Sequence, residues 1–490
     1  MAFNPLQVLK SNADALRVAL DWRQGQEMSQ ADIDVLRNYA GFGGIKTLLF
    51  GEGSKEEWKS QGAKEADLRL HAPMMELYAL LHQHYDDKVY KEVIDSLKNS
   101  VLTSFYTPRF VADVLFDALK EKEIEPKLIY EPSAGAGVFV EAAARAFPEA
   151  ERIFGVEKDL LSARVLEAIS STLPVETFVQ AMPFEMTSKQ ENGRFDLVVS
   201  NIPFGNYPVY DPDIVNPALK DKIHNYFFVA GLDKLRDGGV LAFLTTDAFL
   251  NNPSNEAARE YLFDHADFLS VAVMPDNLMK DNANVEAPTH LLIVQKNEHK
   301  KERTEQEQKL VHAIQNENEF GKFFQNWYLL KNTDCITADE VGAGKNQYGQ
   351  AHEMVWQNGD MQIVADRLSV ILSKDFSLRF DQRLFDQKEE SQKQNKTEGL
   401  TLSFLPPPAV QSKSESVQLG LFDTGPAETI TQAMSYINDL DATVVSRKTA
   451  RILNTIRTKE NQSHDSIVLV AAKALHHKAQ IIFSWIIFID

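Results

Sequence analysis

The chain has 490 residues, is 44% hydrophobic and carries a formal net charge of −19. This length predicts about three domains, and the apolar content supports packed cores. The single cysteine, Cys335, excludes an intrachain disulfide and indicates a reducing compartment. The negative charge opposes broad adhesion to phosphates, so a phosphate-rich partner would need a local basic cluster or the help of a second protein.

Several other classes are disfavoured. The start, Met1-Ala2-Phe3-Asn4-Pro5, has neither the basic nor the apolar region of a secretion signal. No apolar run is long enough to span a membrane, and the 12 histidines offer no zinc-ligand set. Gly44-Ile45-Lys46-Thr47 fails the spacing of a phosphate-binding loop. We therefore expect a cytoplasmic protein without a metal site, a membrane partner or an ATPase motif.

The first 100 residues read as a helical N-terminal domain. Asn4-Pro5 begins one helix with a capping residue and a first-turn proline, and Ser29 with Asp32 resembles a cap for a second. The second helix ends at Gly41. The turn Gly41-Phe42-Gly43-Gly44 has two interpretations, a helix stop with a packing turn or a functional flap.

Residues 101–298 alternate between strand and helix patterns, which predicts an α/β doubly wound parallel sheet. Strands are predicted near 127–131, 152–157, 175–179, 195–200, 239–245, 269–274 and 290–295. Helices are predicted near 138–146, 159–170, 222–236 and 254–264. The connection between the last two strands, Pro275 to Thr289, is too short for a helical crossover, so these strands should pair antiparallel.

A glycine-containing turn follows the first predicted strand. Residues Ser133 to Gly137 form this turn, and a helix begins after it. Glycines let the backbone approach a ligand closely and deliver it to a positive helix N-terminus. Glu157 ends the second strand roughly twenty residues later, where an acid suits a ribose diol. A glycine turn and an acid without a phosphate-binding lysine favour a nucleoside-type cofactor over a dinucleotide.

The run Asn201-Ile202-Pro203-Phe204 stands at the carboxyl end of the fourth predicted strand, where open α/β sheets bind ligands. The Asn201 side chain and the Ile202 carbonyl can both accept hydrogen bonds from an NH2 group, which frees its lone pair for attack. Pro203 stiffens the turn, and Phe204 offers a face for a planar base. A polar strand-end turn without chemistry is the alternative, and the neighbouring motifs favour the site.

The remainder of the chain changes in composition. Residues 299–386 mix helical and short extended patterns and predict a smaller C-terminal domain. Residues 387–417 are rich in Gln, Lys, Glu, Ser and Pro and read as a linker. Residues 418–490 read as a helical tail with an apolar end, which suggests truncation of a longer protein.

Together these segments resemble the motifs of S-adenosylmethionine-dependent DNA adenine-N6 methyltransferases. The resemblance covers residues 101–298 and implies a seven-stranded methyltransferase sheet with target recognition on its C-terminal side, in residues 299–386. It implies S-adenosylmethionine as the cofactor, bound by Tyr106, Thr107, Glu131, Ser133, Gly135, Gly137, Glu157 and Phe184. Asn201, Ile202, Pro203 and Phe204 are similar to the catalytic N-P-P-[FYW] motif.

The sequence departs from the family pattern at two places. Ile202 stands where the family usually has proline, but that position contributes its backbone carbonyl, which isoleucine retains. Replacement of Ile202 by proline is therefore predicted to be tolerated. Ala181-Met182-Pro183 stands where an acid often holds the cofactor adenine, which leaves Phe184 to pack on that ring.

The implied function is site-specific methylation of adenine N6 in duplex DNA. The segment Tyr39 to Gly44 and the Asn-Ile-Pro-Phe-Gly form are similar to a mobile-element-associated group linked to helicases, which implies a helicase-like or restriction partner. Two alternatives stay open. One is methylation of RNA adenine or a protein glutamine, and the other is a non-catalytic methylase-like subunit or anti-restriction factor.

Overall fold

A computed structural model describes residues 4–101, 107–280, 285–346 and 349–387, all within the first of two compact units, Met1–Ala409. The helices are α1 Pro5–Asp21, α2 Gln30–Arg37, α3 Lys55–Ser60, α4 Glu65–Leu68, α5 His71–His84, α6 Asp87–Ser100, α7 Arg109–Glu121, α8 Val138–Ala146, α9 Leu160–Ser170, α10 Ile223–Lys234, α11 Ala248–Asn251, α12 Glu256–His265, α14 Glu305–Val311, α15 Trp327–Lys331, α16 Gln362–Arg379 and α17 Gln382–Asp386. The strands are β1 Leu128–Glu131, β2 Arg152–Val156, β3 Thr177–Gln180, β4 Phe195–Asn201, β5 Leu235–Thr246, β6 Ala266–Met274, β7 Thr289–Lys296, β8 Ala313–Asn318, β9 Gly321–Asn326, β10 Glu340–Lys345 and β11 Ala351–Trp356.

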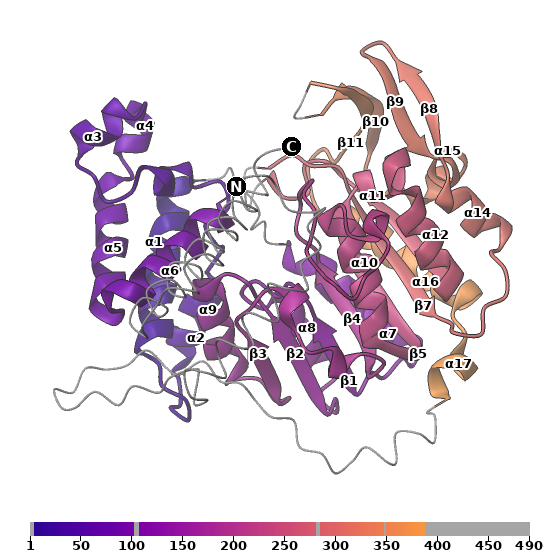
Figure 1. Cartoon of the computed structure of the whole chain (residues 1–490), viewed down its shortest axis with the longest axis horizontal. Helices are drawn as coiled ribbons and strands as arrows, with labels where there is room; N and C mark the ends of the chain where they lie inside the picture. Colours follow the sequence, from indigo (N-terminus) through magenta and orange to yellow (C-terminus); the bar gives the residue numbers. More distant parts are fainter. Residues whose placement is uncertain (1–3, 102–106, 281–284, 347–348, 388–490) are drawn as a thin grey trace, which may run out of the picture. The chain divides into compact units, whose positions relative to one another are not determined.

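A seven-stranded sheet forms the centre of this unit, with strand order β3-β2-β1-β4-β5-β7-β6 (Figure 1). Strands β1 to β5 pair in parallel, whereas β7 runs antiparallel to both β5 and β6. The predicted doubly wound seven-stranded sheet is confirmed. The antiparallel pairing of the last two strands is also confirmed, because β6 and β7 pair antiparallel from Ala266 opposite Lys296 to Met274 opposite Thr289.

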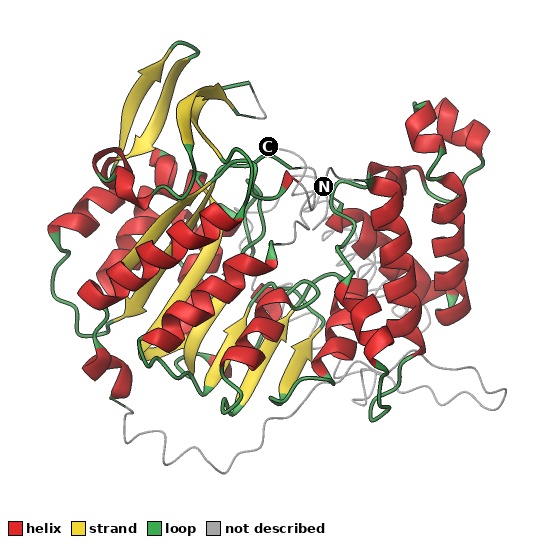
Figure 2. Cartoon of the chain, turned by 180° about the vertical axis from the view of Figure 1, so that it is seen from behind, coloured by secondary structure: helices red, strands yellow, loops and turns green. Residues whose placement is uncertain are grey.

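Helices cover both faces of the sheet (Figure 2), which explains why its strands read as nearly continuous apolar runs. Successive side chains of a strand point to opposite faces. Leu197 and Val199 of β4 join the core under α7, α8 and α16, whereas Val198 joins the core under α10 and α12. All three side chains are buried. Each face therefore has its own apolar core.

The N-terminal helices pack on the sheet domain through α9, which contacts α1, α2 and α6. The turn after α2 is held by Asn12, whose amide donates to the Gly41 carbonyl at 2.6 Å and accepts from the Ala40 N–H at 2.9 Å. Phe42 is buried in the same helical core. These contacts favour the packing-turn interpretation over a flap.

The C-terminal described residues form two hairpins, β8–β9 and β10–β11, and the long helix α16. Helix α16 packs on α7 and β6 and so belongs to the layer that covers one face of the large sheet. The assignment of residues 299–386 to target recognition stays a prediction. The predicted linker and tail, residues 387–417 and 418–490, lie outside the described residues apart from Gln387. No helix in the described part of the chain is long and apolar enough to cross a membrane.

Candidate functional site

The candidate site lies where the strand order of the sheet reverses. The chain winds from β1 through β2 to β3 in one direction and from β4 to β5 in the other, so β1 and β4 are neighbours. Ile129 pairs with Leu197 and Tyr130 with Val198, in parallel register. The carboxyl ends of both strands therefore meet at one edge, which is the ligand-binding position of doubly wound sheets. The predicted cofactor turn follows β1 there, and the Asn201 motif ends β4.

The turn after β1 is tied to the acid that follows β2. The Gly135 N–H donates to the Glu157 carboxylate at 2.7 Å. Gly137 has φ of 95° and precedes the first residue of α8. A Cβ at Gly137 would lie 2.6 Å from the Leu166 side chain, so both the backbone conformation and the packing require glycine. The predicted cofactor turn and the predicted ribose-binding acid are therefore joined directly by a hydrogen bond.

Glu157 retains acceptor capacity despite its internal hydrogen bonds. One carboxylate oxygen accepts from Gly135 and the other from the Asp159 N–H, each at 2.7 Å. An ionised carboxylate offers about four lone-pair positions, so acceptor capacity stays available for a hydroxyl donor. Burial, with a smaller effect from the nearby Asp159, raises the pKa of Glu157 to about 7. Its charge therefore changes close to neutral pH.

Glu131 is a second buried acid at this edge, only 2% exposed. Its Oε2 atom has no hydrogen-bond partner among the described residues. Burial, followed by the charge of Glu157, raises the pKa of the Glu131 carboxyl. A buried acid with an unsatisfied oxygen is costly without a ligand, so Glu131 fits a polar group of a nucleoside-type cofactor. Ser133 and Gly135, on the turn between the two acids, are partly exposed.

The Asn201 motif is fixed to its neighbours through the backbone. The Ile202 N–H donates to the Leu244 carbonyl of β5 at 3.0 Å. The Ser200 hydroxyl donates to the Ser133 carbonyl at 3.3 Å and so joins β4 to the cofactor turn. Ile202 is buried in the core, whereas the other three residues of the motif are partly exposed. The isoleucine thus gains packing where proline would supply rigidity.

The other predicted cofactor residues are placed less directly. Thr107 is buried just before α7, and Tyr106 lies outside the described residues. Phe184 is 4% exposed, and its ring centroid lies 5.9 Å from that of Tyr130 and 5.1 Å from that of Phe227. Most of the Phe184 ring therefore packs into the protein core. Its contact with the cofactor adenine stays a prediction.

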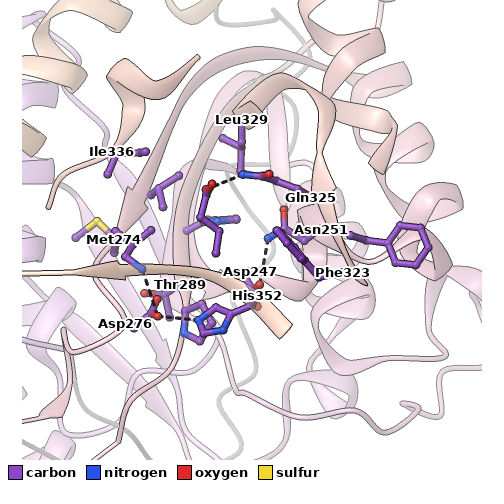
Figure 3. A pocket seen from close by; sticks show the side chains of 16 residues that line it. Asp247, Asn251, Met274, Asp276, Thr289, Phe323, Gln325, Leu329, Ile336 and His352 are labelled. Atoms are coloured by element: carbon purple, nitrogen blue, oxygen red, sulfur yellow. Dashed lines mark hydrogen bonds and ion pairs between the residues drawn. The ribbon is translucent and has the colours of Figure 1, made fainter. Parts of the chain in front are cut away.

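A pocket separate from the candidate site lies between the ends of β5, β6 and β7 and the two hairpins (Figure 3). It contains Asp247 and the ion pair between His352 and Asp276, whose Nε2 and Oδ2 atoms are 2.9 Å apart. The cavity volume is about 40 Å³, which accommodates about three water molecules and is too small for a purine. Asp276 also accepts from the Val355 N–H at 3.4 Å. This cluster therefore anchors the β10–β11 hairpin to the sheet.

Sequence reasoning missed the role of Asp159, which joins three parts of the molecule. Its carboxylate caps α9 by accepting from the Ser162 N–H at 2.8 Å, and it accepts from the Ser96 hydroxyl of α6 at 3.0 Å. Its own N–H binds Glu157. The signal was present, because an aspartate before an apolar helix is a typical N-cap. The long-range partner Ser96 carried no such signal.

Comparison with known proteins identifies the family of the chain. Residues 87–391 match the family described as N-6 DNA Methylase, and the predicted family resemblance is confirmed. Over 183 residues the chain is 28% identical to the Defense against restriction protein B of Escherichia phage P1. The match covers 37% of this chain and 8% of the length of that protein.

Solved structures to which the chain is similar include proteins of type I restriction systems. The subunit from Streptococcus thermophilus is 15% identical with a TM-score of 0.37, over 68% of this chain and 97% of that one. The EcoKI M protein is 14% identical with a TM-score of 0.37, over 80% of this chain and 100% of that one.

Proposed function

The chain belongs to the N-6 DNA Methylase family, and on that premise we propose that it transfers a methyl group from S-adenosylmethionine to the N6 amino group of adenine at specific DNA sites. The observation that carries the proposal is the junction of β1 and β4. The Ser200 hydroxyl bonds to the Ser133 carbonyl, so the predicted cofactor turn and the predicted acceptor motif are held together. A methyl donor and its acceptor must meet in this way.

The proposed cofactor contacts follow from the two acids and the turn. Glu157 would accept hydrogen bonds from the ribose hydroxyls, and the turn at Ser133 to Gly137 would face the remainder of the nucleoside and the methionine part. The unsatisfied Glu131 oxygen would take a polar group of the cofactor. When bound, S-adenosylmethionine supplies a sulfonium-activated methyl group.

The acceptor motif would position the adenine. The Asn201 amide oxygen and the Ile202 carbonyl would accept hydrogen bonds from the N6 amino group, and Phe204 would stack on the base. These contacts hold the amino nitrogen in line for attack and favour its tetrahedral geometry. Positioning of this kind supplies most of the rate enhancement, so no covalent intermediate with the protein is needed.

An adenine within a duplex cannot reach this motif unless it is flipped out of the helix. The net charge of −19 opposes strong contact with the phosphate backbone. We therefore propose that DNA binding by the chain alone is weak and salt-sensitive. A helicase-like or restriction partner would supply further affinity, and residues 310–385 would contribute target choice.

The direct test is transfer of a tritiated methyl group to adenine-containing DNA. Asn201→Ala should abolish transfer but leave cofactor affinity largely unchanged, because this amide serves the acceptor and not the cofactor. Long-read methylation sequencing of a host that expresses the gene would report the base and the target site together. Full activity of Asn201→Ala would exclude the proposed catalytic role.

The second candidate is a non-catalytic methylase-like factor that counters restriction. The observation that favours it is the similarity to the phage P1 protein, whose name describes defence against restriction. Ile202 in place of the usual proline also agrees with it. Binding of S-adenosylmethionine and DNA without turnover would support this candidate. Methyl transfer to RNA or to a protein glutamine in place of DNA would instead identify a different acceptor for the same motif.

A further inference from the structure

An ordered loop of residues 209–220 follows the acceptor motif. Its ends meet, because the Val209 N–H donates to the Lys220 carbonyl at 2.9 Å. Val209, Ile214 and Leu219 are buried and belong to the core beside α10. Closed ends and inward-packed side chains define a compact Ω-loop, a type of surface segment that is frequently functional. We refer to it as the 209–220 loop.

Asp211 holds this loop in one conformation. The side chain is only 1% exposed, and its carboxylate accepts from the Lys189 amino group at 2.5 Å and from the Tyr226 hydroxyl at 3.1 Å. It also accepts from the Asp213 N–H at 3.0 Å, and the Lys220 amino group donates to the Asp211 carbonyl. The loop is therefore anchored to η3, Lys189–Glu191, and to α10, and it has little freedom to collapse on the protein surface.

Two large side chains of the anchored loop point away from the core. Tyr210 is 67% exposed and Val215 is 90% exposed. The loop buries Val209, Ile214 and Leu219, whereas Tyr210 and Val215 stay at the surface of the same segment. They follow Phe204 by six and eleven positions in the sequence, directly after the motif that must receive the target base. Both residues therefore lie on the connection that leads from the acceptor motif to α10.

We propose that the 209–220 loop enters the DNA duplex, where Tyr210 and Val215 occupy the space that the flipped adenine leaves in the base stack. The inference rests on the proposed function and names the residues that would open the duplex. An inserted apolar side chain stabilises an unstacked base step, and an aromatic ring stacks on a base of any sequence. Rigid support matters because a mobile loop would lose its conformational entropy on insertion.

The net charge of the chain supports this role. A protein of charge −19 gains little from phosphate contacts, which are the usual source of DNA affinity. Apolar insertion supplies binding free energy that does not depend on phosphate neutralisation. It also acts only on the open state of the duplex, and so favours flipping as well as binding.

The test compares methyl transfer to two duplexes that differ in the cost of flipping. In one the target adenine is paired with thymine, and in the other it faces an abasic site. The variants are Tyr210→Ala, Val215→Ser and the double substitution. Val370→Ser is the matched control, because Val370 is a 69% exposed valine on α16. All four changes are at exposed positions, and circular dichroism would verify that the fold is retained.

The double variant should lower kcat/KM on the paired adenine about tenfold, which corresponds to about 1.4 kcal/mol. On the unpaired adenine its kcat/KM should stay within about twofold of wild type, because the cost of flipping is already reduced. Fluorescence of 2-aminopurine at the target position should fall in parallel for the paired duplex, whereas Val370→Ser should change neither readout.

An equal loss on both duplexes would overturn the inference, because the loop would then act on the cofactor or on the reaction itself. Unchanged transfer to the paired adenine by the double variant would also overturn it. If wild-type protein methylates neither duplex, the proposed function fails and the inference falls with it. These outcomes separate failure of the loop assignment from failure of the methyltransferase assignment.

Discussion

Replacement of Ile202 by proline would restore the usual family motif and should nevertheless destabilise the protein. The Ile202 N–H donates to the Leu244 carbonyl at 3.0 Å, and both side chains are buried. Proline has no N–H, so the Leu244 carbonyl would lose this partner in a buried position, which costs about 1–3 kcal/mol. Loss of buried apolar volume from Ile202 adds about 1 kcal/mol. Restriction of the unfolded chain by proline returns about 0.4–1 kcal/mol.

The net expectation for Ile202→Pro is a decrease of about 1–3.6 kcal/mol in the free energy of unfolding. Urea denaturation of the full chain measures it. Ile202→Val is the matched control, because valine loses similar volume but keeps the N–H, and it should cost only about 1 kcal/mol. The sequence alone predicts that proline is tolerated here. If Ile202→Pro is as stable as wild type, or more active in methyl transfer, the backbone argument is refuted.

Three further predictions concern the cofactor, the acceptor and the hairpins. Burial raises the pKa of Glu157 to about 7, so S-adenosylmethionine affinity measured by calorimetry should weaken as pH falls below about 7. This pH dependence should be absent in Glu157→Gln. The same pH dependence in both proteins would contradict the role of Glu157 in cofactor binding. The folding stability of the unliganded protein should change with pH in the opposite direction. The raised carboxyl pKa of Glu157 contributes stability at low pH, and this stability is lost as pH rises through about 7. Phe204→Ala should raise the barrier to methyl transfer by about 1–3 kcal/mol, because it removes a stacking contact. This loss of activity should be smaller than that of Asn201→Ala. Equal activity of Phe204→Ala and wild type would exclude the stacking role. Replacement of residues 315–324 of the β8–β9 hairpin by a short glycine linker should weaken the preference for a target site, as measured by methylation sequencing. Cofactor binding, measured by calorimetry, should be spared. An unchanged target site would place recognition outside this hairpin.

The sequence by itself determined the local elements of the sheet domain. Apolar runs of strand length alternate with helical patterns between residues 128 and 296, and β4 and α8 appear within a residue of their predicted bounds. The short β6–β7 connection determined an antiparallel pair, because a parallel return requires a crossover. The acid after β2 and the glycine turn after β1 were also readable, since both are local patterns at strand ends.

Tertiary structure alone decided which distant residues meet. The bond from Ser200 to Ser133 spans 67 positions, and the one from Ser96 to Asp159 spans 63. Helix α16 read as part of a separate C-terminal region, yet it packs on α7 and β6, because its apolar face is buried only against another apolar surface. The Ile202 N–H bond and the burial of Asp211 likewise depend on β5 and α10, which sequence spacing does not place beside them. Local patterns set the elements and their ends, whereas side-chain contacts between those elements set the site.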